Sequence, residues 1–294
     1  MEFNSIMFPA PKFNHKKFLE YDGEIVYIPK KEEKNSYIPC LLLLSASVKV
    51  SNKFLIFFHG NAEDIFGARD ICNRIREILE INIIIVEYPT YSIYTLEKDP
   101  NKMLTDSLEV FDFILNEFKA ETQNIFIFGR SIGTTAAIYL SSKRKPGALI
   151  SVSGFTSIKS VAQNVVGKML GLLVKERFTS KEYIKNVTCP TLFIHGQKDT
   201  LIPFSHSLEL KDNCSGPYEI LLPEEMTHNE FDYDEDLIIP VKNFLDKNTG
   251  ILAEGSPIVL PKHIFDIPLV VKKEFEKNHF YDSNKHQSCT DGNC

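Results

Sequence analysis

A serine flanked by two glycines is the residue of this chain with the clearest chemical meaning. Ser131 stands between Gly129 and Gly133, after an apolar run over residues 125–128 and before an amphipathic stretch over residues 134–141. A sharp turn from strand to helix strains such a serine and exposes its hydroxyl, while the glycines let neighbouring elements approach. A glycine-rich turn with a capping serine would share this pattern, but the flanking elements favour a nucleophile at a helix N-terminus.

A serine hydroxyl becomes a nucleophile only when a base removes its proton and an acid orients that base. After a nucleophile of this kind the expected order along the chain is acid, then histidine. Asp199 follows the apolar run 191–194, at the strand end where open α/β sheets bind ligands, although it could also be a turn residue before Pro203. His228 lies between the last predicted strand and the last predicted helix. We therefore expect a triad of Ser131, Asp199 and His228.

Other acids and histidines fit these roles less well. Asp232, Asp234 and Asp236 cluster at the predicted start of the last helix, where acids complement the helix dipole. His195 precedes the acid, which favours a structural, hydrogen-bonded role. His206 falls in a predicted helix, and we expect it on the surface.

Acyl transfer also needs backbone donors for the negative charge that develops on the carbonyl oxygen. The N–H of Ile132, directly after the nucleophile, is the first predicted donor. The second should come from the loop after the apolar run 54–58, and we place it on Asn61, with Ala62 as the alternative. A plain turn would explain the same loop.

The predicted walls of the site come from neighbouring segments. We expect Ala62, Tyr88 and Tyr91 to contact the substrate. The apolar segment 155–186 lies where α/β proteins with a serine motif of this kind usually carry a cap. A short cap would leave a shallow site able to hold a fatty chain. Packing of one helix onto the core accounts for the same pattern equally well.

Apolar runs alternate with amphipathic stretches from Tyr37 to Leu245, which predicts an α/β protein with a mostly parallel sheet and helices on both faces. Together with the serine motif, this indicates the α/β-hydrolase fold with a short cap. Residues 24–28 predict an antiparallel edge strand that ends at Pro29. The remaining predicted strands span residues 38–44, 54–58, 83–87, 125–128, 148–152, 191–194 and 218–222. The clearest helical patterns lie near residues 68–79 and 104–118.

Composition limits the class of protein. The 294 residues are 43% hydrophobic and 24% charged, which is typical of a globular chain, and the net charge of −6 disfavours nucleic-acid binding. The basic run 143–145 is expected to complement a helix end. The longest apolar runs, 40–44 and 81–86, are far shorter than the roughly 20 residues of a membrane span, and the N-terminus does not have the pattern of a signal peptide.

Domain organisation and cysteines complete the expectations. Residues 1–248 should form the hydrolase domain and residues 249–294 a C-terminal extension that is partly disordered. The six scattered cysteines predict free thiols in a reducing, cytoplasmic setting. We expect no metal and no cofactor. Acylation of Cys289 and Cys294, or a metal site formed by these cysteines with His279 and His286, is a weak alternative, since the spacing matches no standard signature.

Several long motifs resemble one family. HGNAED, IFGRSIGTTAA, TLFIHGQKDTLIPFSHS and LPEEMTHNEFD occur in the same order as in the α/β-hydrolase domain-containing protein 17 group of protein depalmitoylases, and the similarity covers about residues 8–245. The triad of that group falls on Ser131, Asp199 and His228. The resemblance implies hydrolysis of the thioester that joins a fatty acyl group, typically palmitoyl, to protein cysteines.

The family also suggests where such an enzyme acts. Its animal members carry an acylated, cysteine-rich N-terminal segment, whereas no cysteine precedes Cys40 here, so peripheral membrane association stays open. The expected substrate is an acylated protein or a small acyl ester. A small-molecule carboxylesterase or a peptidase would use the same triad, and a binding scaffold that has lost activity is the non-enzymatic alternative.

Overall fold

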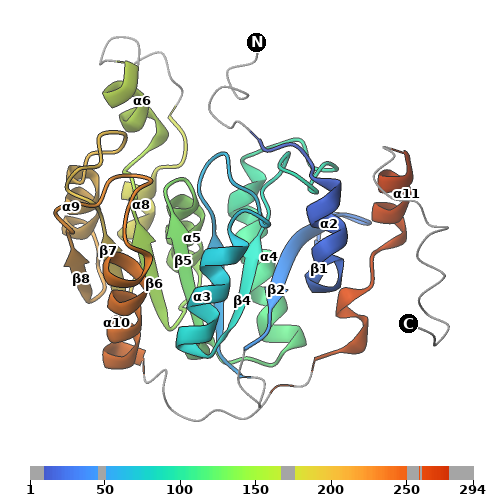
Figure 1. The fold of residues 1–294 in the computed structure, drawn as a ribbon. Coiled ribbons are helices and arrows are strands. Elements are labelled where there is room, and N and C mark those ends of the chain that lie inside the picture. Colours follow the sequence, from blue (N-terminus) through green and yellow to red (C-terminus); the bar gives the residue numbers. More distant parts are fainter. Residues whose placement is uncertain (1–9, 46–50, 167–175, 250–257, 259, 278–294) are drawn as a thin grey trace.

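Eight short apolar runs form one sheet in the computed structural model, which describes residues 10–45, 51–166, 176–249, 258 and 260–277 (Figure 1). The strand order is β1-β2-β4-β3-β5-β6-β7-β8. The strands are β1 Ile25–Pro29, β2 Tyr37–Leu43, β3 Phe54–Phe58, β4 Asn82–Val86, β5 Ile125–Arg130, β6 Ala148–Val152, β7 Thr191–Ile194 and β8 Tyr218–Leu221. All neighbours from β4 to β8 are parallel, while β2 runs antiparallel to β1 and β4. The α/β-hydrolase prediction is confirmed, and so is the antiparallel edge strand.

Helices cover both faces of this sheet (Figure 1). They are α2 His15–Tyr21, α3 Arg69–Leu79, α4 Lys102–Glu117, α5 Gly133–Lys143, α6 Ile158–Val166, α8 Ser180–Ile184, α9 Ser205–Asp212, α10 Ile239–Thr249 and α11 Leu269–Lys277. Four short helical turns are η1 Asp22–Glu24, η2 Thr122–Asn124, η3 Tyr233–Ile238 and η4 Lys262–Phe265. Among the described residues, no helix is both long and apolar enough to cross a membrane.

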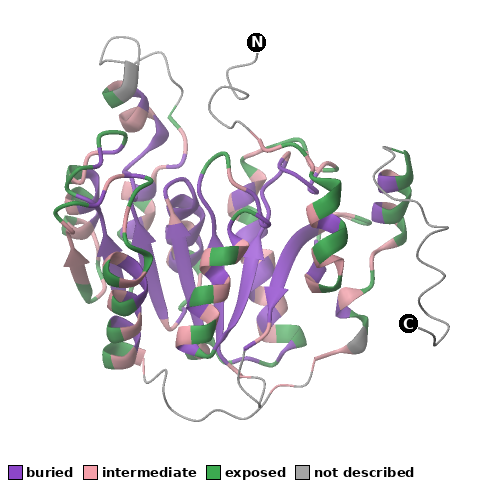
Figure 2. Cartoon of the chain, in the orientation of Figure 1, coloured by how far each residue is buried: buried purple, intermediate pink, exposed green. Residues whose placement is uncertain are grey.

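The strands are apolar on both sides because each side faces a separate core. In β3, Phe54, Ile56 and Phe58 face the core that α4, α5, α8 and α9 cover. Leu55 and Phe57 face the other core, under α2, α3, α10 and α11. The sheet is accordingly the most buried part of the molecule (Figure 2). Such a sheet is a rigid support for the loops that leave its strand ends.

Part of the predicted C-terminal extension returns to the sheet. The η4 segment contacts β1, and Phe275 of α11 packs edge-on against Phe18 of α2 with ring centroids 5.1 Å apart. The rest of the extension lies largely outside the described residues, as do Cys289 and Cys294. Free thiols are confirmed for the four described cysteines, which are Cys40, Cys72, Cys189 and Cys214.

Candidate active site

The turn around Ser131 is built so that only glycine fits at its two flanking positions. Ser131 has a φ of 53°, which is left-handed backbone, and its N–H donates to Val152 O at 2.9 Å. A Cβ on Gly133 would lie 2.2 Å from Phe58 O, and one on Gly129 would lie 2.6 Å from Gly133 O. The start of α5 therefore packs backbone to backbone against the ends of β3 and β5, and these contacts fix the serine at the strand end.

Three side chains from separate loops meet at this serine. His228 Nε2 lies 3.1 Å from Ser131 Oγ, and His228 Nδ1 lies 2.7 Å from Asp199 Oδ2. With Nδ1–H donating to the carboxylate, Nε2 is free to accept the serine proton. The structure thus brings together the three residues that the sequence pattern selected. The arrangement is a continuous hydrogen-bonded chain from carboxylate to hydroxyl.

Asp199 is held as a carboxylate by donors on several sides. Its Oδ1 accepts hydrogen bonds from Leu201 N at 3.0 Å and Ile202 N at 2.8 Å. Burial opposes ionisation, but hydrogen bonds from His195, His228 and the Ile202 N–H outweigh it and hold the pKa of Asp199 well below its usual range. The carboxylate is therefore charged at neutral pH and can stabilise a protonated His228.

The two other histidines near the site are both buried. His195 Nδ1 lies 2.7 Å from Ser207 Oγ, and Nε2 lies 2.8 Å from Ile202 O and 3.3 Å from Asp199 Oδ2. These contacts fit the expected structural role, and the side chain is fully buried. The prediction that His206 lies on the surface is wrong. Its side chain is buried, and Nδ1 lies 3.0 Å from Thr156 Oγ1. His206 therefore lies on the inner face of the short helix α9, where it has a polar partner. Burial lowers the pKa of His206, followed by the effect of His195, which favours the neutral ring.

An open cleft of about 320 Å³ lies over these residues. Besides Ser131 and His228, its lining divides by chemistry. The polar residues are Asn61, Arg130 and Asn229, and the apolar ones are Ile132, Phe155, Ile158, Val161, Leu201 and Ile202. The segment 155–186 does contribute an apolar wall through α6, while its residues 167–175 lie outside the described part of the chain.

The predicted oxyanion donors line the cleft, whereas the predicted wall residues are not among its described lining residues. Ile132 and Asn61 both line the cleft, on the two loops expected to carry the donors. Ala62, Tyr88 and Tyr91 are not among the described lining residues. The two tyrosines are buried behind the loop, where the Tyr88 hydroxyl donates to His59 O at 2.7 Å and the Tyr91 hydroxyl to Asn61 Oδ1 at 2.6 Å. They support the loop from below because burial of their rings demands partners for both hydroxyls.

Sequence reasoning missed a buried pair beneath the same loop. His59 Nε2 lies 3.2 Å from Glu87 Oε1, both side chains are fully buried, and Glu87 Oε2 accepts the N–H of Ile65 at 3.3 Å. Burial opposes the charged ring, but the adjacent Glu87 raises the pKa of His59 above its usual value. Burial likewise raises the pKa of Glu87. Glu87 directly follows the apolar strand β4 and precedes a tyrosine, and only that position could have indicated it.

Comparisons with known proteins agree with this architecture. The family model described as serine hydrolase (FSH1) matches residues 69–229. Alpha/beta hydrolase domain-containing protein 17B of Homo sapiens is 26% identical over 218 residues, covering 74% of each chain. Alpha/beta hydrolase domain-containing protein aho-3 of Caenorhabditis elegans is 27% identical over 204 residues, which are 69% of this chain but 60% of that relative.

Solved structures share the fold at low sequence identity. The esterase Pf2001 of Pyrococcus furiosus superposes with a TM-score of 0.63 at 15% identity, covering 82% of this chain and 95% of that one. Est1E from Butyrivibrio proteoclasticus gives a TM-score of 0.59 at 16% identity, covering 77% and 99%. At such identities the likeness concerns the arrangement of the sheet and helices.

Proposed function

The chain belongs to the serine hydrolase (FSH1) family, and from that premise we propose that Ser131, His228 and Asp199 are its catalytic triad. The observation that carries the proposal is the unbroken hydrogen-bonded chain from Asp199 through His228 to Ser131 Oγ. The cleft above the serine supplies space for an acyl group, and the described residues around it include the two loops that would carry oxyanion donors.

The proposed reaction is acyl transfer in two steps. Ser131 Oγ attacks the acyl carbonyl carbon while His228 Nε2 takes the hydroxyl proton, and Asp199 stabilises the resulting imidazolium. The oxyanion accepts hydrogen bonds from the N–H groups of Ile132 and Asn61. Collapse breaks the bond to the leaving thiol or alcohol, which receives the proton from His228. Water, activated by the same histidine, then hydrolyses the acyl-enzyme and restores the serine.

For the substrate we propose a long-chain acyl thioester on protein cysteines, as the resemblance to the α/β-hydrolase domain-containing protein 17 group implies. The open cleft admits a bulky protein substrate, and the apolar residues Phe155, Ile158, Val161 and Leu201 offer a surface for the acyl chain. Each buried methylene contributes about 0.8 kcal/mol, so a longer chain gains affinity along this wall. Acylated proteins lie at membrane surfaces, which suggests that a cytoplasmic enzyme of this kind acts beside a membrane.

The triad is tested by active-site labelling. A fluorophosphonate probe should label the wild-type protein and should not label Ser131→Ala, because the probe reacts with the activated hydroxyl. Ser142→Ala, on α5 but outside the site, should be labelled as the wild type is. Asp199→Asn and His228→Ala should lose several orders of magnitude in turnover while remaining folded. Undiminished labelling of Ser131→Ala would rule the triad out.

The substrate proposal is tested by comparing leaving groups and chain lengths. Turnover of palmitoyl-cysteine peptides should exceed that of short-chain esters and aminoacyl amides, measured as kcat/KM on one enzyme preparation. A preference for short esters would replace the depalmitoylase by a carboxylesterase, and a preference for amides by a peptidase. No turnover of any activated ester by a folded protein would point instead to a binding scaffold.

A further inference from the structure

One cation, Arg130, lies between the turn of the nucleophile, the loop of His228 and the loop that follows β3. Arg130 is the last residue of β5, directly before Ser131, and its side chain is 19% exposed. Arginine carries five N–H donors in a rigid planar fork, so a single guanidinium can hold several partners at fixed mutual positions. The contacts of Arg130 show which partners it holds.

On one side the guanidinium binds the loop of His228. Nη2 donates to His228 O at 3.0 Å and to Asn229 Oδ1 at 2.9 Å. The guanidinium carbon also lies 5.8 Å from the ring centroid of Phe231, within the range of a cation–π contact. Both hydrogens of Nη2 are therefore used to hold the loop that carries the base.

On the other side the guanidinium meets the loop of the proposed oxyanion donor. Nη1 lies 3.8 Å from Glu63 Oε2, and this oxygen accepts the N–H of Gly60 at 2.9 Å. A Cβ on Gly60 would lie only 2.7 Å from Arg130 Nη1, so the loop comes this close because residue 60 is glycine. Gly60 directly precedes Asn61, so the backbone that carries the donor is tied to the same cation.

The His228 loop is also held from the acid side and by a hydrogen bond of its own. Lys198 N donates to Met226 O at 3.1 Å, and Thr227 N donates to Glu230 O within the loop itself. From the nucleophile side, Arg130 ties this loop to the end of β5, in addition to the contact of His228 Nε2 with Ser131 Oγ. Because its charge already faces Glu63 and its Nη2 hydrogens are taken, the group is arranged to position protein loops and not to bind an anionic substrate.

We propose that Arg130 is a positioning residue that sets the base and the oxyanion donor relative to the nucleophile. The inference rests on the proposed triad. A displacement of about 1 Å in such a site costs about 100-fold in rate. A lysine at this position keeps the charge but, as a single compact ammonium, cannot occupy both Nη positions at once.

The experiment compares Arg130→Ala and Arg130→Lys with Arg144→Ala. Arg144 is a matched control because it makes a similar two-bond contact, with Asp112 at 2.9 Å for both bonds, at the far end of α5. With an activated ester as substrate, kcat should fall about 10- to 100-fold in both Arg130 variants while KM changes little. Arg144→Ala should keep the wild-type kcat. Millimolar guanidinium should restore part of the kcat of Arg130→Ala and leave Arg130→Lys unchanged.

Several outcomes overturn the inference. These are a wild-type kcat in either Arg130 variant, a rise in KM at constant kcat, and a loss of kcat that guanidinium does not restore in a folded Arg130→Ala. If Arg130→Ala does not fold, the kcat of Arg130→Lys tests the inference alone. A fall of about 10- to 100-fold supports it and a wild-type kcat overturns it. Fluorophosphonate labelling of the wild type and its absence in Ser131→Ala are measured in parallel. Failure of those two controls would reject the triad itself, whatever the Arg130 variants show.

Discussion

At the scale of single residues, the site depends on backbone contacts that leave no room for a side chain. Gly196, between β7 and Asp199, shows this most clearly, because an added Cβ would lie 2.0 Å from Met226 O. Met226 is buried and stands two residues before His228. The distance between the acid loop and the histidine loop is thus set by a glycine that touches backbone.

Gly196→Ala should therefore push the histidine loop outward. We expect a loss of stability of about 1 to 3 kcal/mol from overpacking and a fall in the kcat of the folded protein, whereas a variant that meets no neighbour should show neither effect. Gly23→Ala is the control, since an added Cβ there meets no atom within 4 Å. Urea unfolding and ester turnover measure the two effects. Wild-type turnover in Gly196→Ala would show that the loops can separate without cost.

Residue types and their order were enough to select the members of the hydrogen-bonded chain, because the serine motif restricts its surroundings so strongly. The same reasoning missed Arg130 and Glu87 and misplaced His206. Arg130 occupies a motif position that admits any residue, and Glu87 is the residue directly after the apolar strand β4. Their partners come from loops far apart in the sequence, so only the folded chain identifies them. His206 looked exposed because a two-turn helix has too few residues to define its buried face.

At the scale of elements, every predicted strand is present, with ends that differ by at most two residues. Apolar composition identified β1 to β7 because these strands are buried on both faces, whereas β8 at the sheet edge is only partly buried. The start of the helix that follows His228, which leads through η3 into α10, was also anticipated, and Asp232 caps it by accepting from Asp234 N and Glu235 N. Its first turn is a π-helix over Tyr233–Ile238, a local widening that periodicity does not reveal.

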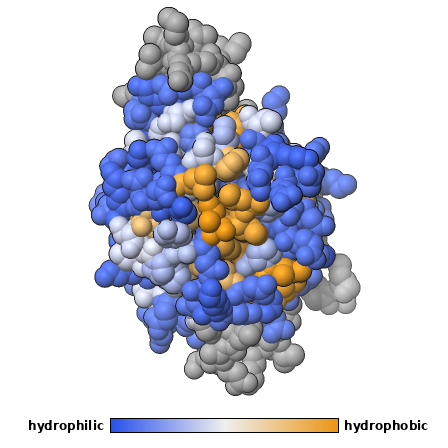
Figure 3. Space-filling view, turned by 90° about the vertical axis from the view of Figure 1, so that its left-hand side faces the viewer, coloured by the Kyte–Doolittle hydropathy of each residue, from blue (hydrophilic) through white to orange (hydrophobic). Residues whose placement is uncertain are grey.

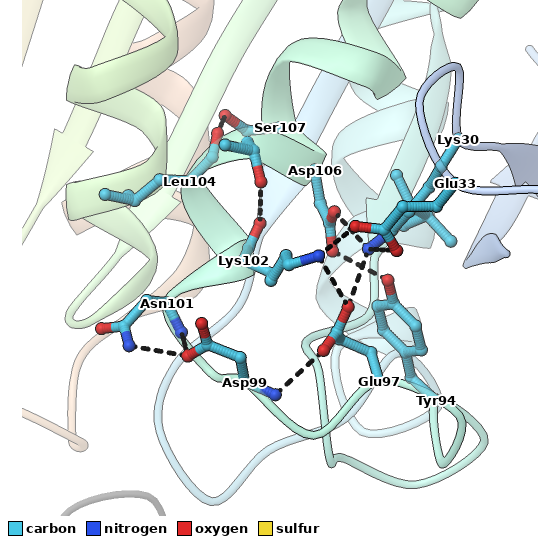
Figure 4. A network of polar contacts seen from close by, with 12 residues as sticks. Lys30, Glu33, Tyr94, Glu97, Asp99, Asn101, Lys102, Leu104, Asp106 and Ser107 are labelled. Carbon is cyan, nitrogen blue, oxygen red and sulfur yellow. Dashed lines mark hydrogen bonds and ion pairs between the residues drawn. The ribbon is translucent and has the colours of Figure 1, made fainter.

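A buried ion cluster joins the end of β1 to α4 (Figure 4). Lys30 Nζ lies 3.0 Å from Asp106 Oδ1 and 3.1 Å from Glu97 Oε2, and the Tyr94 hydroxyl donates to Asp106 at 2.9 Å. Burial raises the pKa of Asp106 to about 6 in spite of Lys30. The folded protein therefore holds this proton more tightly than the unfolded chain does.

Stability from Asp106 should fall as pH rises. Between about pH 4 and 6 the unfolded chain releases the proton while the folded protein keeps it, so the free energy of unfolding of the wild type minus that of Asp106→Asn should decrease by about 2 to 3 kcal/mol. Urea titrations at several pH values measure it. Asp112→Asn is the control, because hydrogen bonding to Arg144 lowers the pKa of Asp112, and its contribution should be lost only as pH falls below about 4. A flat difference for Asp106→Asn would contradict the assignment.

At the scale of the whole molecule, the two edges of the sheet have different surroundings. The β1 edge is contacted by η4, and α11 packs beside it through Phe275, which is 1% exposed. On the side where β8 forms the other edge, hydrophobic residues gather in a surface patch (Figure 3). Val271 and Phe275 of α11 belong to the hydrophobic core that also contains Phe18 of α2, so this described part of the C-terminal segment packs on the rest of the chain.

Phe275→Ala should cost about 3 to 5 kcal/mol of stability, since it removes a buried ring from the contact with Phe18. Leu269→Ala, on the same helix but 68% exposed, should change stability by less than about 0.5 kcal/mol. Turnover of an activated ester by the folded Phe275→Ala protein should equal that of the wild type, because α11 contributes no lining to the cleft. Equal stability of the two variants would show that α11 is not anchored through this ring.

The contact between His228 and Ser131 spans 97 positions of the chain, and Asp199 comes from a third segment between them. During synthesis from the N-terminus, a ribosome would expose the nucleophile long before the base. The growing polypeptide would stay catalytically silent until β7 and β8 had joined the sheet. If the proposed triad is right, the appearance of turnover during refolding would report that β7, β8 and the loop of His228 have joined the sheet.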